Sequence, residues 1–237
     1  MTSSSGSGRE VRLAGIGAAL VLFALTTITN TDTDLWGHTR FGLDMLRDHN
    51  LPADDPYSFT QDKPWVNHEW LSEIQMGAAY ALAGPAGLAL LKGVFTFTAL
   101  VLIWGALRGI DVAPRIIIFA IGAMSTVPVT RTLRPQVWSV VLLVIFCRIL
   151  IEDRQRARWW CPILLALWAN LHGGWIVGFG ILVIWTSGDL LNWGRGDLRT
   201  PDLKTSDFKS PNPQISKSPY APVAIALLSL LATLLTP

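Results

Sequence analysis

Long apolar runs alternate along this chain with short polar clusters of two different kinds. One kind contains acidic residues, His, Asn and a pair of Arg, and the other consists of loops rich in Lys and Arg. Each apolar run joins a cluster of one kind to a cluster of the other. A chain with this pattern can bury its apolar runs by crossing a lipid bilayer as helices. The pattern predicts an all-α, polytopic membrane protein in which the acidic residues, His, Asn and Arg pair lie on one face of the membrane.

Composition agrees with this class. Of the residues, 51% are hydrophobic and 15% are charged, and there are 11 Trp, whereas a soluble domain carries about 25% charged residues. The formal net charge is +2. The excess cations are concentrated in short loops and do not form a basic face, so no nucleic-acid partner is expected.

Seven apolar segments are predicted to cross the membrane, after a polar cytoplasmic tail at residues 1–10. They are residues 11–29, 86–107, 115–130, 137–150, 159–171, 175–191 and 221–235. Several are shorter than the roughly 20 residues that a perpendicular crossing requires. Interfacial Trp residues such as Trp159, Trp160 and Trp175 are placed to anchor such short helices.

The first connection, residues 30–68, is long and polar. Within it, residues 34–49 place apolar side chains on one helical face, which predicts an amphipathic helix lying in the membrane interface. Residues 69–83 form a second expected helix that is too short and too polar at its start to cross. We interpret it as juxtamembrane.

The basic loops set the orientation. Residues 108–115, 148–158 and 195–217 carry most of the cations, and loops of this kind remain in the cytoplasm. The N-terminus is then cytoplasmic, and the connections at 30–68, 131–136 and 172–174 face outward. Residues 194–219 read as a low-complexity cytoplasmic loop between a transmembrane module at 11–193 and a last helix at 220–237. The chain ends directly after that helix, which we interpret as a truncated product.

Five stretches together resemble a bacterial branch of the GT-C superfamily, the integral-membrane glycosyltransferases that use a polyprenyl-phosphate sugar donor, including the protein O-mannosyltransferase and aminoarabinose-transferase branches. The stretches are Asp-Thr-Asp-Leu-Trp-Gly-His at 32–38, Asp-Pro-Tyr-Ser-Phe-Thr at 55–60, Pro-Trp-Val-Asn-His-Glu-Trp-Leu at 64–71, Arg-Pro-Gln at 134–136 and Trp-Ala-Asn-Leu-His-Gly-Gly at 168–174. The resemblance implies a bacterial inner-membrane enzyme with an outward-facing site, and it assigns the role of general base to Asp34.

The chemistry of sugar transfer specifies roles for the polar residues. A carboxylate must take the acceptor proton, and cations must stabilise the departing phosphate. The expected catalytic residues are Asp34, Asp32 and His38. The expected substrate-binding residues are Asn67, His68, Glu69, Arg131, Arg134, Gln136, Asn170 and His172, with the two Arg assigned to phosphate. The acceptor is a lipid, a glycan or a protein.

Simpler interpretations stay open for each cluster. Asp32 and Asp34 are also suited to capping a helix, and an outward Arg pair is also suited to contacting lipid headgroups. No cofactor is specified, and the spacing of Asp34, His38, His68 and Glu69 does not decide between a site with a divalent metal ion and a metal-free one. The alternative functions are a transporter or flippase-like protein, and an inactive truncated subunit.

Overall fold

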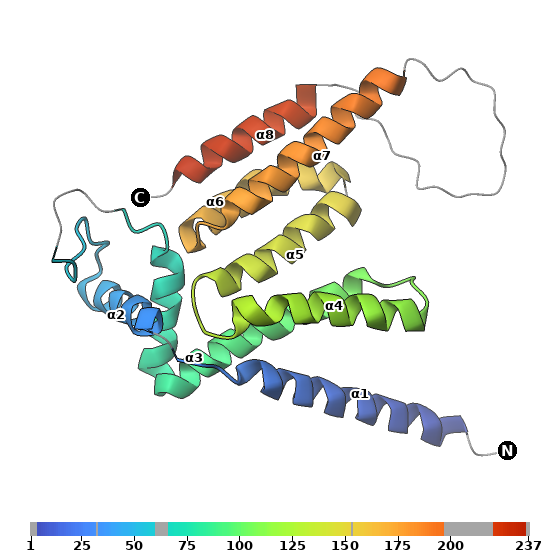
Figure 1. Cartoon of the computed structure of the whole chain (residues 1–237), viewed down its shortest axis with the longest axis horizontal. Coiled ribbons are helices and arrows are strands. Elements are labelled where there is room, and N and C mark those ends of the chain that lie inside the picture. The colour runs from blue at the N-terminus through green and yellow to red at the C-terminus, as the bar shows by residue number, and fades with distance from the viewer. Residues whose placement is uncertain (1–3, 32, 60–65, 153, 197–219, 236–237) are drawn as a thin grey trace. The chain divides into compact units, whose positions relative to one another are not determined.

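The computed structural model describes residues 4–31, 33–59, 66–152, 154–196 and 220–235. All regular secondary structure in these ranges is helical, which confirms the all-α class (Figure 1). The helices are α1 (Ser4–Thr27), α2 (Thr33–Asp48), α3 (Trp70–Ala106), α4 (Val112–Thr130), α5 (Gln136–Glu152), α6 (Arg154–Leu171), α7 (Trp175–Gly196), α8 (Tyr220–Ala232) and the short 3₁₀ helix η1 (Thr233–Leu235).

Two differences from the expected boundaries concern polar segments. Helix α1 begins at Ser4, within the expected tail. Helix α6 begins at Arg154, so part of the expected basic loop at 148–158 is helical, because Arg, Gln and Ala are good helix formers. Most of the expected loop at 194–219 lies outside the described residues.

The described residues form two compact units. The first contains the chain up to Ile145 together with Asn170–Gly173, and the second contains Phe146–Ala169 and the residues from Gly174 onward. In the second unit, the Trp168 ring lies so close to α7 that a Cβ on Gly178 would be 2.6 Å from it. The residues that concern the candidate site all belong to the first unit.

Helix α3 contains a sharp break that separates its two halves. Ala83 and Gly84 have non-helical backbone angles, and Gly84 has a φ of 57°, a left-handed conformation that glycine adopts without steric cost. Pro85 follows and has no N–H to continue the hydrogen-bond ladder. The break therefore falls between the two segments, 69–83 and 86–107, that the sequence predicts as separate helices.

The first half of α3 packs closely against α2. A Cβ on Gly42 would lie 1.8 Å from the backbone oxygen of Glu73, and a Cβ on Gly77 would lie 2.5 Å from the backbone of Gly42. The two backbones are therefore in direct contact at this crossing. Leu35, Thr39, Gly42 and Met45 form the buried face of α2.

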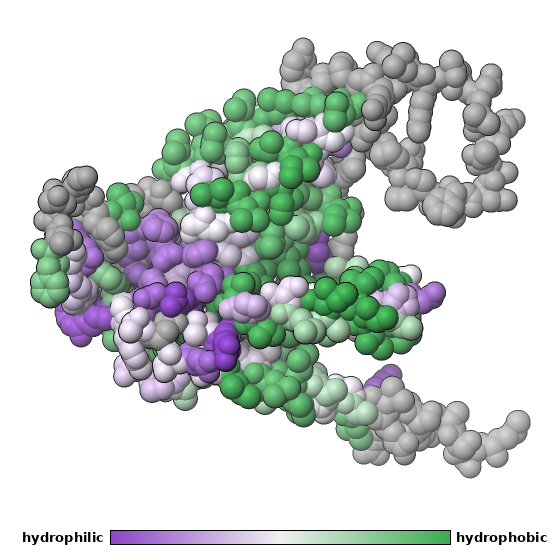
Figure 2. All heavy atoms as spheres, in the orientation of Figure 1, coloured by the Kyte–Doolittle hydropathy of each residue, from purple (hydrophilic) through white to green (hydrophobic). Residues whose placement is uncertain are grey.

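Helices α3 and α4 are long and apolar enough to cross a membrane, whereas the other apolar helices are shorter. None of the apolar window of α4 is buried. A helix that is apolar all round and exposed is suited to contact with lipid. In Figure 2, hydrophobic residues cover α1 and α4, whereas hydrophilic residues gather around α2 and its contact with α3.

Candidate functional site

Two connections that are distant in the sequence meet at the site. The backbone N–H of Asn30, which follows α1, donates a hydrogen bond of 3.0 Å to the carbonyl of Arg131, which follows α4. Asn30 also pairs with Thr132 in an isolated parallel bridge. This bridge places the connection that leads into α2 beside the connection that leads into α5 (Figure 1).

Asp34 and Arg134 extend from these two connections and form an ion pair. Oδ2 of Asp34 lies 2.9 Å from Nη1 of Arg134, and the side chains are 52% and 34% exposed. Asp34 lies in the first turn of α2, where the helix dipole also favours a negative charge. The pair is an accessible carboxylate held against a guanidinium.

Glu69 lies at the centre of three histidines. Its carboxylate oxygens are 3.8 Å from Nδ1 of His38, 3.8 Å from Nε2 of His68 and 3.7 Å from Nε2 of His172. These side chains come from α2, from the segment before α3 and from the connection between α6 and α7. Three of the four histidines of the chain therefore face one carboxylate, and we refer to Glu69, His38, His68 and His172 as the histidine cluster.

Glu73 contacts His38 of this cluster and is a site residue that the sequence analysis missed. It is 3% exposed, its Oε1 lies 2.9 Å from Nδ1 of His38, and its Oε2 accepts a hydrogen bond from the side-chain amide of Asn67. Asn67 also accepts the backbone N–H of Glu69 at 3.0 Å. The available signal was the spacing of Glu69 and Glu73, which places both on one face of a helix.

Asn170 and His172 are held in place by neighbours from other helices. The indole N–H of Trp70 donates to the side-chain oxygen of Asn170 at 2.7 Å. Oγ of Ser139 lies 2.8 Å from Nδ1 of His172, so the other ring nitrogen of His172 is directed toward Glu69. These contacts attach the connection between α6 and α7 to α3 and α5.

The charges of the cluster oppose the effects of burial. Burial lowers the pKa of His38, but the hydrogen bond and charge of Glu73, with the charges of Glu69 and Asp34, outweigh it and raise that pKa. Burial raises the pKa of the Glu69 carboxyl, although His38 and His68 oppose the change. Burial, together with the charges of His68 and His38, lowers the pKa of His172. Groups with opposite shifts at one place are typical of functional sites.

Most of the predicted site residues lie in this region. Those in the contacts described above are Asp34, His38, Asn67, His68, Glu69, Arg134, Asn170 and His172. Arg131 contributes its backbone carbonyl to the bridge and its side chain is exposed. Gln136 begins α5 and is partly exposed. Asp32 lies outside the described residues.

The described residues contain no group of three or more His, Cys, Asp or Glu side chains arranged to hold a metal ion. The sequence left open whether Asp34, His38, His68 and Glu69 hold a metal ion, and in this structure these four side chains do not form such a group. The short distances of Asp34 and His38 are to Arg134 and to Glu73. No step of the chemistry proposed below depends on a metal ion.

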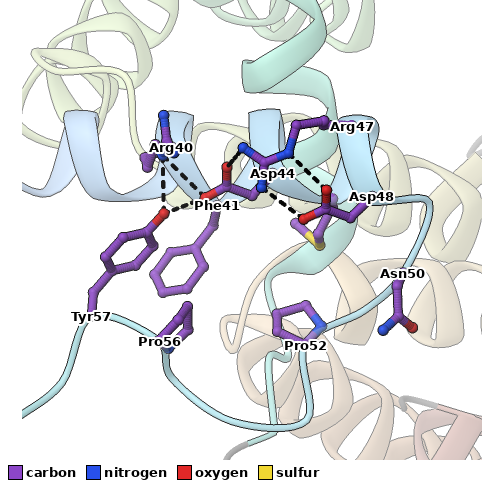
Figure 3. Close-up of a pocket in the computed structure, with 10 residues that line it drawn as sticks. Arg40, Phe41, Asp44, Arg47, Asp48, Asn50, Pro52, Pro56 and Tyr57 are labelled. Carbon is purple, nitrogen blue, oxygen red and sulfur yellow. Dashed lines mark hydrogen bonds and ion pairs between the residues drawn. The ribbon is translucent and has the colours of Figure 1, made fainter.

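A separate pocket of about 310 Å³ lies between the later turns of α2 and the proline-rich loop that follows (Figure 3). Asp44, one of the lining residues, is the centre of a polar network: Arg40 and Arg47 approach its carboxylate at 3.1 and 3.0 Å, and the Tyr57 hydroxyl donates to it. Arg47 also pairs with Asp48 at 2.7 Å. The network attaches the loop to α2.

Comparison with known proteins gave no match to any family model, any curated protein or any solved structure.

Proposed function

We propose that this protein is a membrane glycosyltransferase of the bacterial inner membrane. It transfers a sugar from a polyprenyl-phosphate donor to a hydroxyl or amine of a lipid, glycan or protein acceptor. The observation that carries the proposal is the convergence of polar residues from the connections 30–38, 67–73, 131–139 and 170–172 at one place in a chain that is otherwise strongly apolar. Clustered ionisable groups with shifted pKa values, such as His38, Glu69 and His172, are typical of functional sites.

In the proposed reaction, Asp34 acts as the general base. Its carboxylate takes the proton of the acceptor hydroxyl while the acceptor oxygen forms a bond to the anomeric carbon of the sugar. The bond between that carbon and the phosphate oxygen breaks, and the electron pair leaves with the polyprenyl phosphate. Asp34 then releases its proton to water, which reaches this half-exposed side chain.

Arg134 is proposed to bind the donor phosphate and thereby activate Asp34. A guanidinium binds phosphate oxygens with two parallel donors, and in the structure one of its nitrogens is 2.9 Å from Asp34. Arrival of the donor draws Arg134 toward the phosphate, which weakens the ion pair. The Asp34 carboxylate is then free to face the acceptor only when the donor is present. Arg131, exposed on the same connection, is the second proposed phosphate ligand.

A seven-span topology with a cytoplasmic N-terminus is part of the proposal. A cysteine at Ser58 would face outward and a cysteine at Gly109 would face the cytoplasm, each in a variant with Cys147 and Cys161 replaced by Ala. An impermeant maleimide added to intact cells should label the first and leave the second until the membrane is opened. The reverse pattern would contradict the outward orientation.

Donor binding tests the role of Arg134. Undecaprenyl phosphate is added to the protein in nanodiscs and its binding is measured by native mass spectrometry. The variant Arg134→Gln should bind about 10-fold to 100-fold more weakly, the effect of losing one charge-assisted hydrogen-bonded pair. Asp34→Asn should bind more tightly than wild type, because Arg134 no longer has a competing carboxylate. Arg115→Gln, far from the site in α4, is the matched control and should bind like wild type.

Transfer tests the role of Asp34. With an undecaprenyl-phosphate sugar as donor, Asp34→Asn should lower turnover by about 10²-fold to 10⁴-fold, the usual contribution of a general base, while donor binding persists. Full transfer by Asp34→Asn would exclude it as the base.

Equal binding of undecaprenyl phosphate by wild type and Arg134→Gln would favour the transporter alternative, in which the same residues line a path for a different solute.

A further inference from the structure

Lys92 is a buried cation within an apolar helix. It lies in the second half of α3, a helix long and apolar enough to span a membrane, and it is 3% exposed. Lys92 and Glu73 are the charged residues that are buried among those the structure describes. Removing an ammonium group from water costs several kcal/mol unless other groups solvate it. A lysine at this position therefore requires a specific environment.

The ends of two other helices provide that environment. Nζ of Lys92 donates hydrogen bonds of 2.6 Å to the carbonyl of Ile28 and 2.9 Å to the carbonyl of Thr130. Ile28 directly follows α1 and Thr130 is the last residue of α4. The last carbonyls of a helix have no partner within it and carry the negative end of its dipole. One ammonium thus donates a hydrogen bond to a carbonyl at the end of each of two helices.

The two carbonyls lie immediately before the bridge that joins the site connections. Ile28 is two residues before Asn30, and Thr130 directly precedes Arg131, whose carbonyl accepts the Asn30 N–H. Asp34 is four residues after Asn30, and Arg134 is two residues after Thr132. Any change in the separation of the two helix ends would therefore change the separation of Asp34 and Arg134.

We propose that Lys92 is a positioning residue for the candidate site. By binding the ends of α1 and α4, its ammonium sets the register of the two connections, which is the alignment of Asn30 with Thr132. This alignment in turn sets the distance between Asp34 and Arg134. The effect on transfer rests on the proposed function, but the effect on register does not. A role in stability alone predicts a different result: Lys92→Met would lower the free energy of unfolding, because the carbonyls of Ile28 and Thr130 lose their donor, but it would leave the register of the two connections in the folded protein unchanged.

Disulfide trapping measures the register directly. In a Cys147→Ala/Cys161→Ala background, cysteines replace Asn30 and Thr132. Residues paired on adjacent strands lie about 5 Å apart, within the range that a disulfide bridges. The rate of disulfide formation with a mild oxidant is followed in nanodiscs. Lys92→Met should lower this rate at least about tenfold, because the effective concentration of one thiol at the other falls when the two connections move independently.

Arg115→Met is the matched control. Arg115 also donates to a helix carbonyl, that of Trp104 at 2.9 Å, but it does so at the other end of the α3–α4 hairpin, so the rate should equal that of the reference protein. If Lys92→Met does not fold, Lys92→Gln, which keeps a neutral donor, takes its place in the same assay. An unchanged trapping rate in the folded variant would overturn the proposal.

Transfer activity separates this inference from the proposed function. Lys92→Met should lower turnover, and oxidation of the cysteine pair should restore part of it by fixing the register covalently. Turnover that trapping fails to restore would overturn the link between register and transfer. If the reference protein shows no transfer with any lipid-linked donor, the proposed function fails, and the trapping rates still decide the role of Lys92.

Discussion

At both ends of the α3–α4 hairpin, a cationic side chain donates a hydrogen bond to a helix carbonyl, but the two contacts have different results. At the end near the site, buried Lys92 binds carbonyls from two other helices, at sequence separations of 64 and 38 residues. At the opposite end, Arg115 binds the carbonyl of Trp104, 11 residues away, and its guanidinium lies 3.9 Å from the centre of the Trp104 ring. A cation on a helix carbonyl organises distant segments in the first case and closes one local turn in the second.

The difference extends to the surroundings of each end. Near the site, the hydrogen bond from Trp70 to Asn170 joins residues separated by 100 positions, and the polar groups contact one another. Around Arg115 the hydrogen bonds described are local: its backbone N–H donates to the carbonyl of Asp111 at 3.0 Å, and Trp104 is 39% exposed. Long-range contacts couple many segments, so a substitution at the site end should affect several helices, whereas one at the opposite end should remain local.

The largest expected effect is at the glycine crossing of α2 and α3. Gly42→Val would place side-chain atoms on the backbone of Glu73, where a Cβ alone would be 1.8 Å from the oxygen. We expect a loss of at least about 3 kcal/mol in unfolding free energy, beyond ordinary overpacking. Gly122→Ala in α4 is the control, since its Cβ would be 3.6 Å from Ile103. Thermal unfolding in detergent, followed by Trp fluorescence, should show no loss for the control. Equal losses would remove the distinction between the two regions.

A smaller effect is expected from Glu73→Gln. The substitution keeps the shape of the side chain and removes the charge that His38 and Asn67 contact. We expect a loss of about 2 kcal/mol, the usual value for hydrogen bonds to a charged group. The double variant with His38→Gln should lose less than the sum of the two single variants, because the residues act as a pair. Additive losses would show that the contact contributes little.

Arg115→Met should cost about 1 kcal/mol or less, the range of a partly exposed cation–π contact. Hydrogen exchange should increase only at the α3–α4 turn, and protection of α2 should stay unchanged. Increased exchange in α2 would show that the opposite end is coupled to the site after all.

The smallest expected effect is a dependence of stability on pH that the histidine cluster imposes. The pKa of His38 is raised above its ordinary 6.5, so its contribution is fully present below pH 6.5 and is lost as pH rises through the folded value. The pKa of His172 is lowered, so stability is lost as pH falls from 6.5 through its folded value. In thermal unfolding from pH 5 to 8, His38→Gln should flatten the alkaline side and His172→Gln the acid side. Unchanged profiles would contradict these assignments.

The sequence was sufficient for the features that depend on local patterns. Apolar runs predict an all-helical chain, the spacing of Leu35 and its neighbours predicts the amphipathic helix found as α2, and the separate segments 69–83 and 86–107 predict the break in α3. Each of these properties is encoded within one or two helical turns of the chain.

Long-range partners were not predictable from local patterns. Lys92 reads as one cation inside an apolar run, and its role depends on carbonyls of Ile28 and Thr130 that no side-chain pattern marks. Gly42 and Gly77 read as ordinary helical glycines until the two backbones are seen in contact. The pairing of Asp34 with Arg134 likewise depends on the bridge at Asn30.

The break in α3 also determines how much of that helix a bilayer has to accommodate. As one straight rod, its 37 residues would measure about 55 Å, well beyond a hydrocarbon core of about 30 Å. The part from Pro85 to Ala106 measures about 33 Å, which matches the core with a small tilt. In the proposed topology, the bend at Ala83 and Gly84 separates a length of helix that would fit the lipid from the length that carries Glu69 and Glu73.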